Sequence, residues 1–170
     1  SALWHVPVAG TPIEPSKARR VSLSTGSGSS PRLAADYLLY VSSKGGGDAI
    51  WKVRGETATE LWSATDARII GAPAISRDAN RIAFSTTHNS VASLHVANAD
   101  GTGARVVTQS LALQGTPAWA PDGQSITVAG TVDGTPRLFS VPLDGRAPSV
   151  FVREHASEPV WSPDGRLLLY

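Results

Sequence analysis

The sequence of 170 residues contains no cysteine and no methionine, and only 6% of its residues are aromatic. Without cysteine, a disulfide framework, a thiolate metal site and a cysteine nucleophile are all excluded. An excess of charge of one sign is also lacking, because 15 Lys and Arg nearly balance 14 Asp and Glu and leave a net charge of +1. No global field would attract nucleic acid or an anionic membrane, so we expect neither as a partner.

Long apolar runs and catalytic motifs are lacking too. No run approaches the ~18 residues of a membrane span, and no signal-peptide pattern follows Ser1, so we expect no membrane insertion. The sequence has no Gly-x-Ser-x-Gly elbow, no phosphate loop and no His-Glu-x-x-His motif around any of the four histidines His5, His88, His95 and His155. We therefore predict no catalytic, cofactor-binding or metal-binding residues, no cofactor, and a protein that is not an enzyme.

Two short segments resemble binding motifs without meeting their requirements. The run 98–103, Asn-Ala-Asp-Gly-Thr-Gly, resembles the middle of an EF-hand loop, but the register would place Val96 and Val107 at ligand positions. We predict a turn that connects two strands. The run 17–20, Lys-Ala-Arg-Arg, is the one dense basic cluster, and we predict a solvated loop that leads into a strand.

What the sequence does contain is an internal repeat. Four segments of one pattern include Pro31, Pro73, Pro117 and Pro159, which fall 42, 44 and 42 positions apart, and each is followed by a turn signal and a short apolar run. A period of about 40–45 residues with short strands is typical of propeller blades.

The two clearest copies show the content of one unit. The runs 119–123, Trp-Ala-Pro-Asp-Gly, and 161–165, Trp-Ser-Pro-Asp-Gly, have the chemistry of a tight turn, and the apolar runs after them predict a hairpin. A second pair of alternating strands follows in each unit, with third strands expected at 3–6, 50–53, 94–96 and 138–141 and fourth strands at 20–23, 59–62, 105–108 and 149–152. Four strands per unit predict a propeller blade.

We therefore predict an all-β fold, a β-propeller of four-stranded antiparallel blades. The chain would hold about four blade-equivalents in a single domain over 1–170, with half blades at 1–30 (third and fourth strands) and 159–170 (first and second strands) around whole blades at 31–72, 73–116 and 117–158. Gly- and Ser-rich stretches lie between predicted strands and indicate surface loops rather than a second domain.

The two half blades leave three hypotheses open. The segment 3–23 could pair with 158–170 within one molecule and close a compact four-bladed ring, which would remove exposed strand edges. The same pairing between two copies would give a homodimer that completes an eight-bladed ring. The absence of methionine, even at position 1, agrees instead with a piece of a longer propeller.

The tryptophans are interpreted as packing residues rather than ligand contacts. Trp119 and Trp161 stand at the repeat position of Leu33 and Ile75, and exchange among large apolar residues at one position indicates packing between neighbouring blades. Trp4 and Trp51 are assigned to the position of Leu94 and Leu138, and Trp62, in a fourth strand, is also expected in the core.

The repeat resembles that of a known family. Residues 117–128 and 159–170 look like the Pro-x-Trp-Ser-Pro-Asp-Gly repeat of the TolB-like, WD-like β-propellers, and 94–101 and 138–145 look like its second half. The resemblance spans essentially the whole chain and is weaker at Pro31 and Pro73, where the turn has diverged.

The resemblance implies a function as well as a fold. TolB-like propellers occur as bacterial periplasmic components that bind partner proteins, as extracytoplasmic sensor or regulator domains, and as gating domains of prolyl-oligopeptidase-type peptidases. The resemblance thus implies a non-enzymatic module that binds a protein or peptide through loops at one mouth of the propeller, in a periplasmic or extracytoplasmic setting, and the alternatives are a gating propeller of a peptidase or a sensor domain.

Overall fold

The computed structural model describes residues 2–6 and 15–170, and almost all of its regular structure is β-sheet. The first sheet joins β1 (Trp4–His5) to β2 (Arg19–Arg20), with a 3-10 turn, η1 (Pro15–Lys17), between them. Three four-stranded sheets follow: β3 (Ser29–Leu33), β4 (Leu38–Lys44), β5 (Gly47–Arg54) and β6 (Thr57–Ser63); β7 (Arg68–Ile75), β8 (Arg81–His88), β9 (Val91–Asn98) and β10 (Arg105–Thr108); β11 (Ala112–Trp119), β12 (Ser125–Val132), β13 (Thr135–Pro142) and β14 (Ser149–Val152). The last sheet joins β15 (Val160–Trp161) to β16 (Leu168–Leu169).

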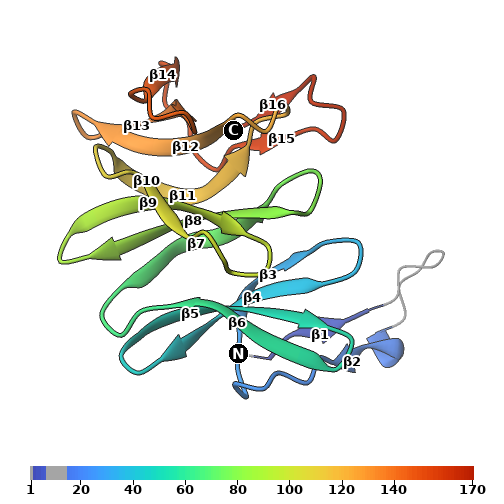
Figure 1. Ribbon diagram of the computed structural model, residues 1–170. Helices are drawn as coiled ribbons and strands as arrows, with labels where there is room; N and C mark the ends of the chain where they lie inside the picture. Colours follow the sequence, from blue (N-terminus) through green and yellow to red (C-terminus); the bar gives the residue numbers. More distant parts are fainter. Residues whose placement is uncertain (1, 7–14) are drawn as a thin grey trace.

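The sheets are arranged as the blades of a propeller. Each four-stranded sheet is antiparallel and keeps its strands in chain order, and successive sheets fan out around a common edge (Figure 1). The first strands β3, β7, β11 and β15 are neighbours along this inner edge. The predicted fold class is confirmed, with three whole blades framed by two half blades.

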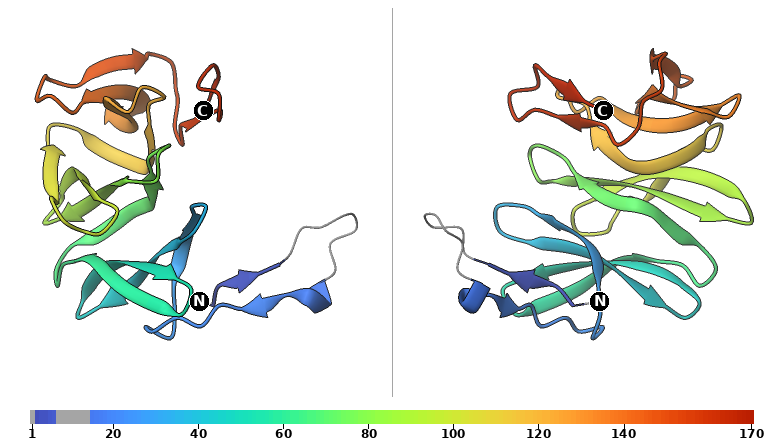
Figure 2. Two further views of the ribbon diagram at one scale, coloured as in Figure 1. Left: turned by 45° about the vertical axis from the view of Figure 1, so that its right-hand side comes forward. Right: turned by 180° about the vertical axis from the view of Figure 1, so that it is seen from behind.

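The two half blades do not close the ring within one molecule. Among the described residues, β1 pairs with β2 alone and β15 with β16 alone, so the first of the three hypotheses, a pairing of 3–23 with 158–170 within one molecule, is wrong. The physical reason is visible in the arrangement, because the half blades lie at opposite ends of an arc of three blades (Figure 2). Pairing between two copies stays a prediction.

The core lies between the sheets rather than within one layer. On β8, side chains alternate between faces, so Ile82 and Phe84 pack in the cluster shared with β3–β6, while Ala83 packs in the cluster shared with β11–β14. A third, smaller cluster joins Leu138 of β13 to Ala156 and the half-buried Leu168 of β16. Each whole blade is thus stabilised by apolar burial against its neighbours.

Polar side chains also bridge the blades, and they bond to main-chain oxygens. The Tyr37 hydroxyl donates to the Ala79 carbonyl at 2.9 Å, and Lys52 Nζ donates to the Ala99 carbonyl at 2.7 Å. One blade further on, Arg81 Nη2 donates to the Gly123 carbonyl at 2.9 Å. These carbonyls lie in turns, so the bonds fix the turns of one blade against the preceding blade.

Three repeat prolines, Pro31, Pro73 and Pro117, lie inside the first strands, whereas Pro159 directly precedes β15. Strands β7 and β11 begin at Arg68 and Ala112, and Pro73 and Pro117 come near their ends. The predicted repeat units begin at or next to the prolines. They therefore assign the first residues of β7 and β11 to the preceding unit. The prolines are tolerated because they occupy irregular stretches of the ladder, where no N–H is required.

Two tryptophans differ from the expected positions. In the sheet ladders, Trp51 stands opposite Tyr40, just as His95 stands opposite Phe84 and Phe139 opposite Val128. Trp51 therefore occupies the repeat position of His95 and Phe139. This is one residue away from the position assigned from the sequence. A shift of one residue moves a side chain to the other face of a strand. Trp51 accordingly stacks on Tyr40, with ring centroids 6.5 Å apart.

The expectation that Trp4 packs between blades is also wrong for this structure. Its side chain is 62% exposed, because β1 and β2 form only a half blade. Trp62 is half-buried and packs against the core as predicted, with its ring centroid 5.1 Å from that of Phe84.

A half-buried histidine makes the stability of the fold dependent on pH. The His95 ring stacks on Phe84 with centroids 4.9 Å apart, also contacts Trp62, and its Nε2 is hydrogen-bonded to Thr86 Oγ1 at 2.9 Å. Burial lowers the pKa of His95, so at mildly acidic pH the unfolded chain takes up a proton that the folded chain resists.

We expect the free energy of unfolding to fall as the pH is lowered below about 6.5, by at most about 1.4 kcal/mol per pH unit for this one group. The contribution is complete above the ordinary histidine pKa of about 6.5 and is lost below it. Urea unfolding at several pH values measures it, and His95→Gln, which keeps a hydrogen-bonding group without a titration, should flatten the profile. An equally steep profile in this variant would assign the dependence to other groups.

Candidate interaction surface

The inner strands share a feature that the repeat pattern does not reveal. Each has a residue with positive φ just before its proline: Ser30 (52°), Gly71 (69°), Gly115 (61°) and Glu158 (50°). In β7 the ladder pairs Ile70↔Ser85 and Ala74↔Ala83 leave three residues opposite one, and β11 has the same irregularity at 115–117. These bulges bend the inner edges of the blades that begin with β7 and β11.

The bulges of neighbouring blades bond to one another. Ser30 Oγ donates to the Gly71 carbonyl at 3.4 Å, the Ala72 N–H donates to Thr116 Oγ1 at 3.2 Å, and the Thr116 N–H donates to Glu158 Oε2 at 3.3 Å. The contacts run from blade to blade along the inner edge of the arc. They join the inner edges of successive blades directly.

The turns after the inner strands are stabilised internally. Ser76 Oγ donates to Asp78 Oδ1 at 2.6 Å, and Ser162 Oγ donates to Asp164 Oδ1 at 2.5 Å, at equivalent positions two repeats apart. These hydroxyls, followed by backbone N–H donors, lower the pKa values of Asp78 and Asp164. Both carboxylates stay ionised near neutral pH and are oriented toward their own turns.

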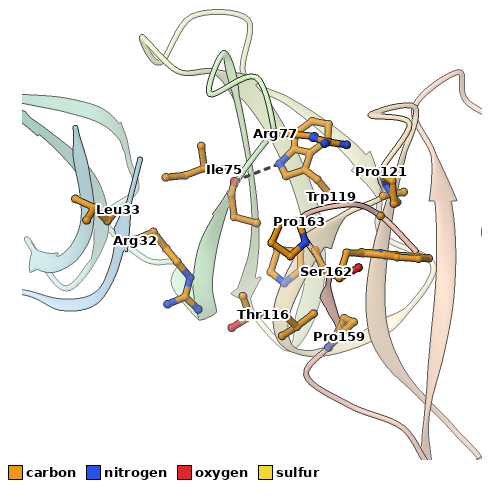
Figure 3. Close-up of a pocket in the computed structure, with 17 residues that line it drawn as sticks. Arg32, Leu33, Ile75, Arg77, Thr116, Trp119, Pro121, Pro159, Ser162 and Pro163 are labelled. Carbon is orange, nitrogen blue, oxygen red and sulfur yellow. Dashed lines mark hydrogen bonds between the residues drawn. The ribbon is translucent and has the colours of Figure 1, made fainter. Parts of the chain in front are cut away.

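An open cavity of about 500 Å³ lies where the inner strands meet these turns (Figure 3). We call it the mouth cavity. Its lining comes from four successive repeats and comprises Arg32 and Leu33; Ala74, Ile75 and Arg77; residues 116–121; and residues 159–163 with Gly165. Prolines and apolar side chains supply most of this lining. Leu33, which stands at the repeat position of Trp119 and Trp161, is 79% exposed there.

Trp119 and Trp161 line the mouth cavity, and each indole group is also hydrogen-bonded to the preceding blade. Trp119 is buried, donates from Nε1 to the Ala74 carbonyl of the preceding blade at 3.3 Å, and is covered by the Arg81 guanidinium at 4.5 Å from the ring centroid. Trp161 is half-buried and donates from Nε1 to Thr127 Oγ1 at 3.0 Å. The prediction that both tryptophans pack between neighbouring blades is confirmed.

The charged groups in the lining are both cations. Arg32 comes from β3 and Arg77 from the turn after β7. No Asp, Glu or His is among the described residues that line the mouth cavity. The surface can therefore bind an apolar group and, beside it, a group of negative charge, but the lining offers no side chain suited to general acid or base chemistry.

The residues that the sequence analysis considered and set aside lie elsewhere. His5 and His155 are exposed, His88 Nδ1 lies 3.4 Å from Asp66 Oδ1, and His95 is half-buried against Phe84. The segment 98–103 is a turn between β9 and β10, in which Asp100 Oδ1 accepts the Thr102 N–H at 2.9 Å. Across residues 2–6 and 15–170, no three His, Asp or Glu side chains gather as a metal site would need.

Sequence reasoning missed Arg32, Leu33 and Arg77 as surface residues of interest. One signal was available, because Arg32 and Leu33 lie within the repeat segment at Pro31, and Arg77 lies in the turn after the segment at Pro73. Their grouping depends on how far successive blades rotate, and a repeat pattern does not give that angle.

Within the described part of the chain, no helix has the length and hydropathy to cross a membrane.

Comparison with known proteins places the chain in a family. The sequence matches the family described as the TolB beta propeller domain over residues 17–170, which is most of the chain. This protein therefore belongs to the TolB β-propeller family, and the resemblance found in the repeats is confirmed.

Solved structures agree on the fold. TolB from Acinetobacter baumannii superposes with a TM-score of 0.76 at 18% identity, over 98% of this chain and 42% of that one. A TolB homologue from Agrobacterium tumefaciens gives 0.73 at 18% identity, over 96% of this chain and 60% of that one. An acylaminoacyl peptidase from Pyrococcus horikoshii gives 0.59 at 17% identity, over 79% and 26%. The chain thus spans 42% and 60% of the two TolB chains.

Proposed function

We propose that this chain is a non-enzymatic binding module of TolB type, in a periplasmic or extracytoplasmic setting, that holds a protein or peptide at the mouth cavity. The observation that carries the proposal is the cavity itself, an open apolar surface assembled from the inner strands of four successive repeats. Loops on a rigid scaffold are the usual location of binding residues, and concave apolar surfaces with a few polar groups are the usual form of a binding site.

The chemistry of the lining supports binding rather than catalysis. Acid–base or nucleophilic catalysis needs a base near the reacting group, and the described lining contains neither a carboxylate nor an imidazole. Its serine, Ser162, is engaged with Asp164 inside its own turn. A peptide with an apolar side chain, in contrast, can displace water from the cavity without any reaction.

The test removes one exposed apolar side chain from the cavity. Peptides selected from a random display library on the immobilised chain are measured by isothermal titration. Leu33→Ser is expected to weaken their binding about tenfold or more, since burial of a leucine contributes about 1.5–3 kcal/mol. Because Leu33 is 79% exposed in the free chain, the urea midpoint should stay the same.

Leu167→Ser is the matched control, since Leu167 is also an exposed leucine, at 66%, but does not line the mouth cavity. Its peptide affinity should equal that of the unchanged chain. Equal weakening in both variants, or none in either, would mean that the peptides bind elsewhere.

The second candidate is the gating propeller of a prolyl-oligopeptidase-type peptidase, and the third is the sensor domain of a bacterial regulator. The peptidase is favoured by one specific finding, the similarity to the acylaminoacyl peptidase chain. A Gly-x-Ser-x-Gly hydrolase domain in the flanking gene sequence, labelled by a fluorophosphonate probe in the full-length protein, would establish it. A winged-helix region upstream would favour the regulator.

A further inference from the structure

The mouth cavity has an electrostatic character that the chain as a whole lacks. The net charge is only +1, yet both charged side chains in the lining, Arg32 and Arg77, are cations. The positive charge in the lining of the mouth cavity therefore does not follow from the net charge of the chain. A surface of one sign around an apolar floor selects partners by sign as well as by shape.

The carboxylates in the neighbouring turns do not neutralise these cations by direct contact. Asp78 accepts hydrogen bonds from Ser76 and Asn80, and Asp164 accepts them from Ser162 and Arg166, all within their own turns. Arg77 contributes to the low pKa of Asp164 through its charge only.

The guanidinium donors are largely unused in the free chain. Among the described residues, Arg77 has no side-chain hydrogen bond, and Arg32 has one, from Nη1 to the Pro31 carbonyl at 3.0 Å. Each guanidinium can present five N–H donors, in a planar arrangement that fits a carboxylate. Both guanidinium groups can therefore donate hydrogen bonds to a carboxylate of a partner without first breaking a bond to an acidic group of this protein.

Nucleic acid fits the same cavity less well. Recognition of single strands depends on open aromatic faces against which bases stack. Trp119 is buried and its ring is covered by Arg81, and the Trp161 ring lies against Phe151 with centroids 5.9 Å apart. The prolines and small side chains that remain suit an aliphatic side chain instead.

We propose, on the basis of the function proposed above, that the mouth cavity binds an internal segment of a partner protein in which an apolar side chain is adjacent to Asp or Glu. The apolar side chain lies on the proline-lined floor beside Leu33, and the carboxylates accept hydrogen bonds from Arg77 and Arg32. The two arginines, Leu33 and residues 116–121 of this site come from the three whole blades, and the half blade β15–β16 with its flanking residues supplies 159–163 and Gly165.

The test uses three fluorescein-labelled peptides of about ten residues with blocked ends, so that side chains supply the only charges. One alternates glutamate with leucine and valine; the other two carry glutamine or lysine in place of glutamate. Anisotropy at low salt should show the glutamate peptide binding at least about tenfold tighter than the glutamine peptide, with a difference that shrinks as salt is added.

Arg77→Glu should remove this preference and favour the lysine peptide. Arg153→Glu makes the same change of charge on an exposed residue outside the cavity lining and should leave the preference intact. Urea unfolding confirms that each variant folds. Equal binding of the glutamate and glutamine peptides, or equal effects of the two variants, would overturn the proposal.

The outcome also separates this proposal from the function on which it rests. If Leu33→Ser weakens all three peptides equally while glutamate gives no advantage, binding at the mouth cavity stands and the preference for acidic segments is wrong. If Leu33→Ser changes none of them, the binding surface itself has been assigned wrongly.

Discussion

Replacing Trp119 with alanine is expected to lower the free energy of unfolding by about 3–5 kcal/mol, the range for a large buried aromatic side chain. Trp119 is only 7% exposed and belongs to the cluster that joins two whole blades. The change leaves a cavity between β7 and β11, removes the donor to the Ala74 carbonyl, and uncovers the Arg81 guanidinium. Urea unfolding followed by far-UV circular dichroism measures the loss.

Trp161→Ala is the informative comparison. From the repeat alone, the two tryptophans would be equally costly, but Trp161 is half-buried, and we expect a loss of about 1–2 kcal/mol. Trp119→Phe keeps most of the packing and leaves the Ala74 carbonyl without its donor, so it should cost about 1–3 kcal/mol. If Trp119→Ala left the urea midpoint unchanged, Trp119 would not be the anchor between these blades.

The blades could be predicted from the sequence because their information is local. A Pro-Asp-Gly turn between two apolar runs specifies a hairpin within about a dozen residues, and the turn residues at 121–123 and 163–165 do so here. Alternation along β8 also indicates two apolar faces, and in the structure Phe84 and Ala83 pack against different neighbours. One strand pattern repeated along the chain was therefore enough to identify a propeller.

The mouth cavity could not be predicted in this way, because it depends on contacts between repeats. The exposure of Leu33 and the burial of Trp119 at one repeat position follow from which strand lies beside each of them, not from the pattern they share. The misplacement of Trp51 has a related cause. In a strand with large side chains at consecutive positions, alternation alone does not say which one faces the preceding blade, and only the ladder to Tyr40 decides it.

Gly71→Ala is also expected to destabilise the fold strongly, although it adds only one carbon atom. Gly71 has φ of +69°, where a residue with a Cβ is strained by about 1–2 kcal/mol. Its added Cβ would also lie 2.5 Å from the carbonyl carbon and oxygen of Gly115 in the next blade. Backbone cannot rotate away as a side chain can, so the inner strands must separate. Strain and overpacking together predict a loss of about 2–5 kcal/mol.

Two other glycines separate the causes. Gly55→Ala introduces positive-φ strain alone, since nothing lies within 4 Å of its added Cβ, and should cost about 1–2 kcal/mol. The Cβ of Gly115→Ala meets the Glu158 carboxylate, but this side chain can rotate away at the loss of its bond to the Thr116 N–H, so an intermediate cost is expected. The order of the three urea midpoints shows how much of the loss comes from positive-φ strain and how much from the close contact with Gly115. If Gly71→Ala were no worse than Gly55→Ala, the inner strands would be free to move apart, and the close contact of the bulges would not fix the arc that forms the mouth cavity.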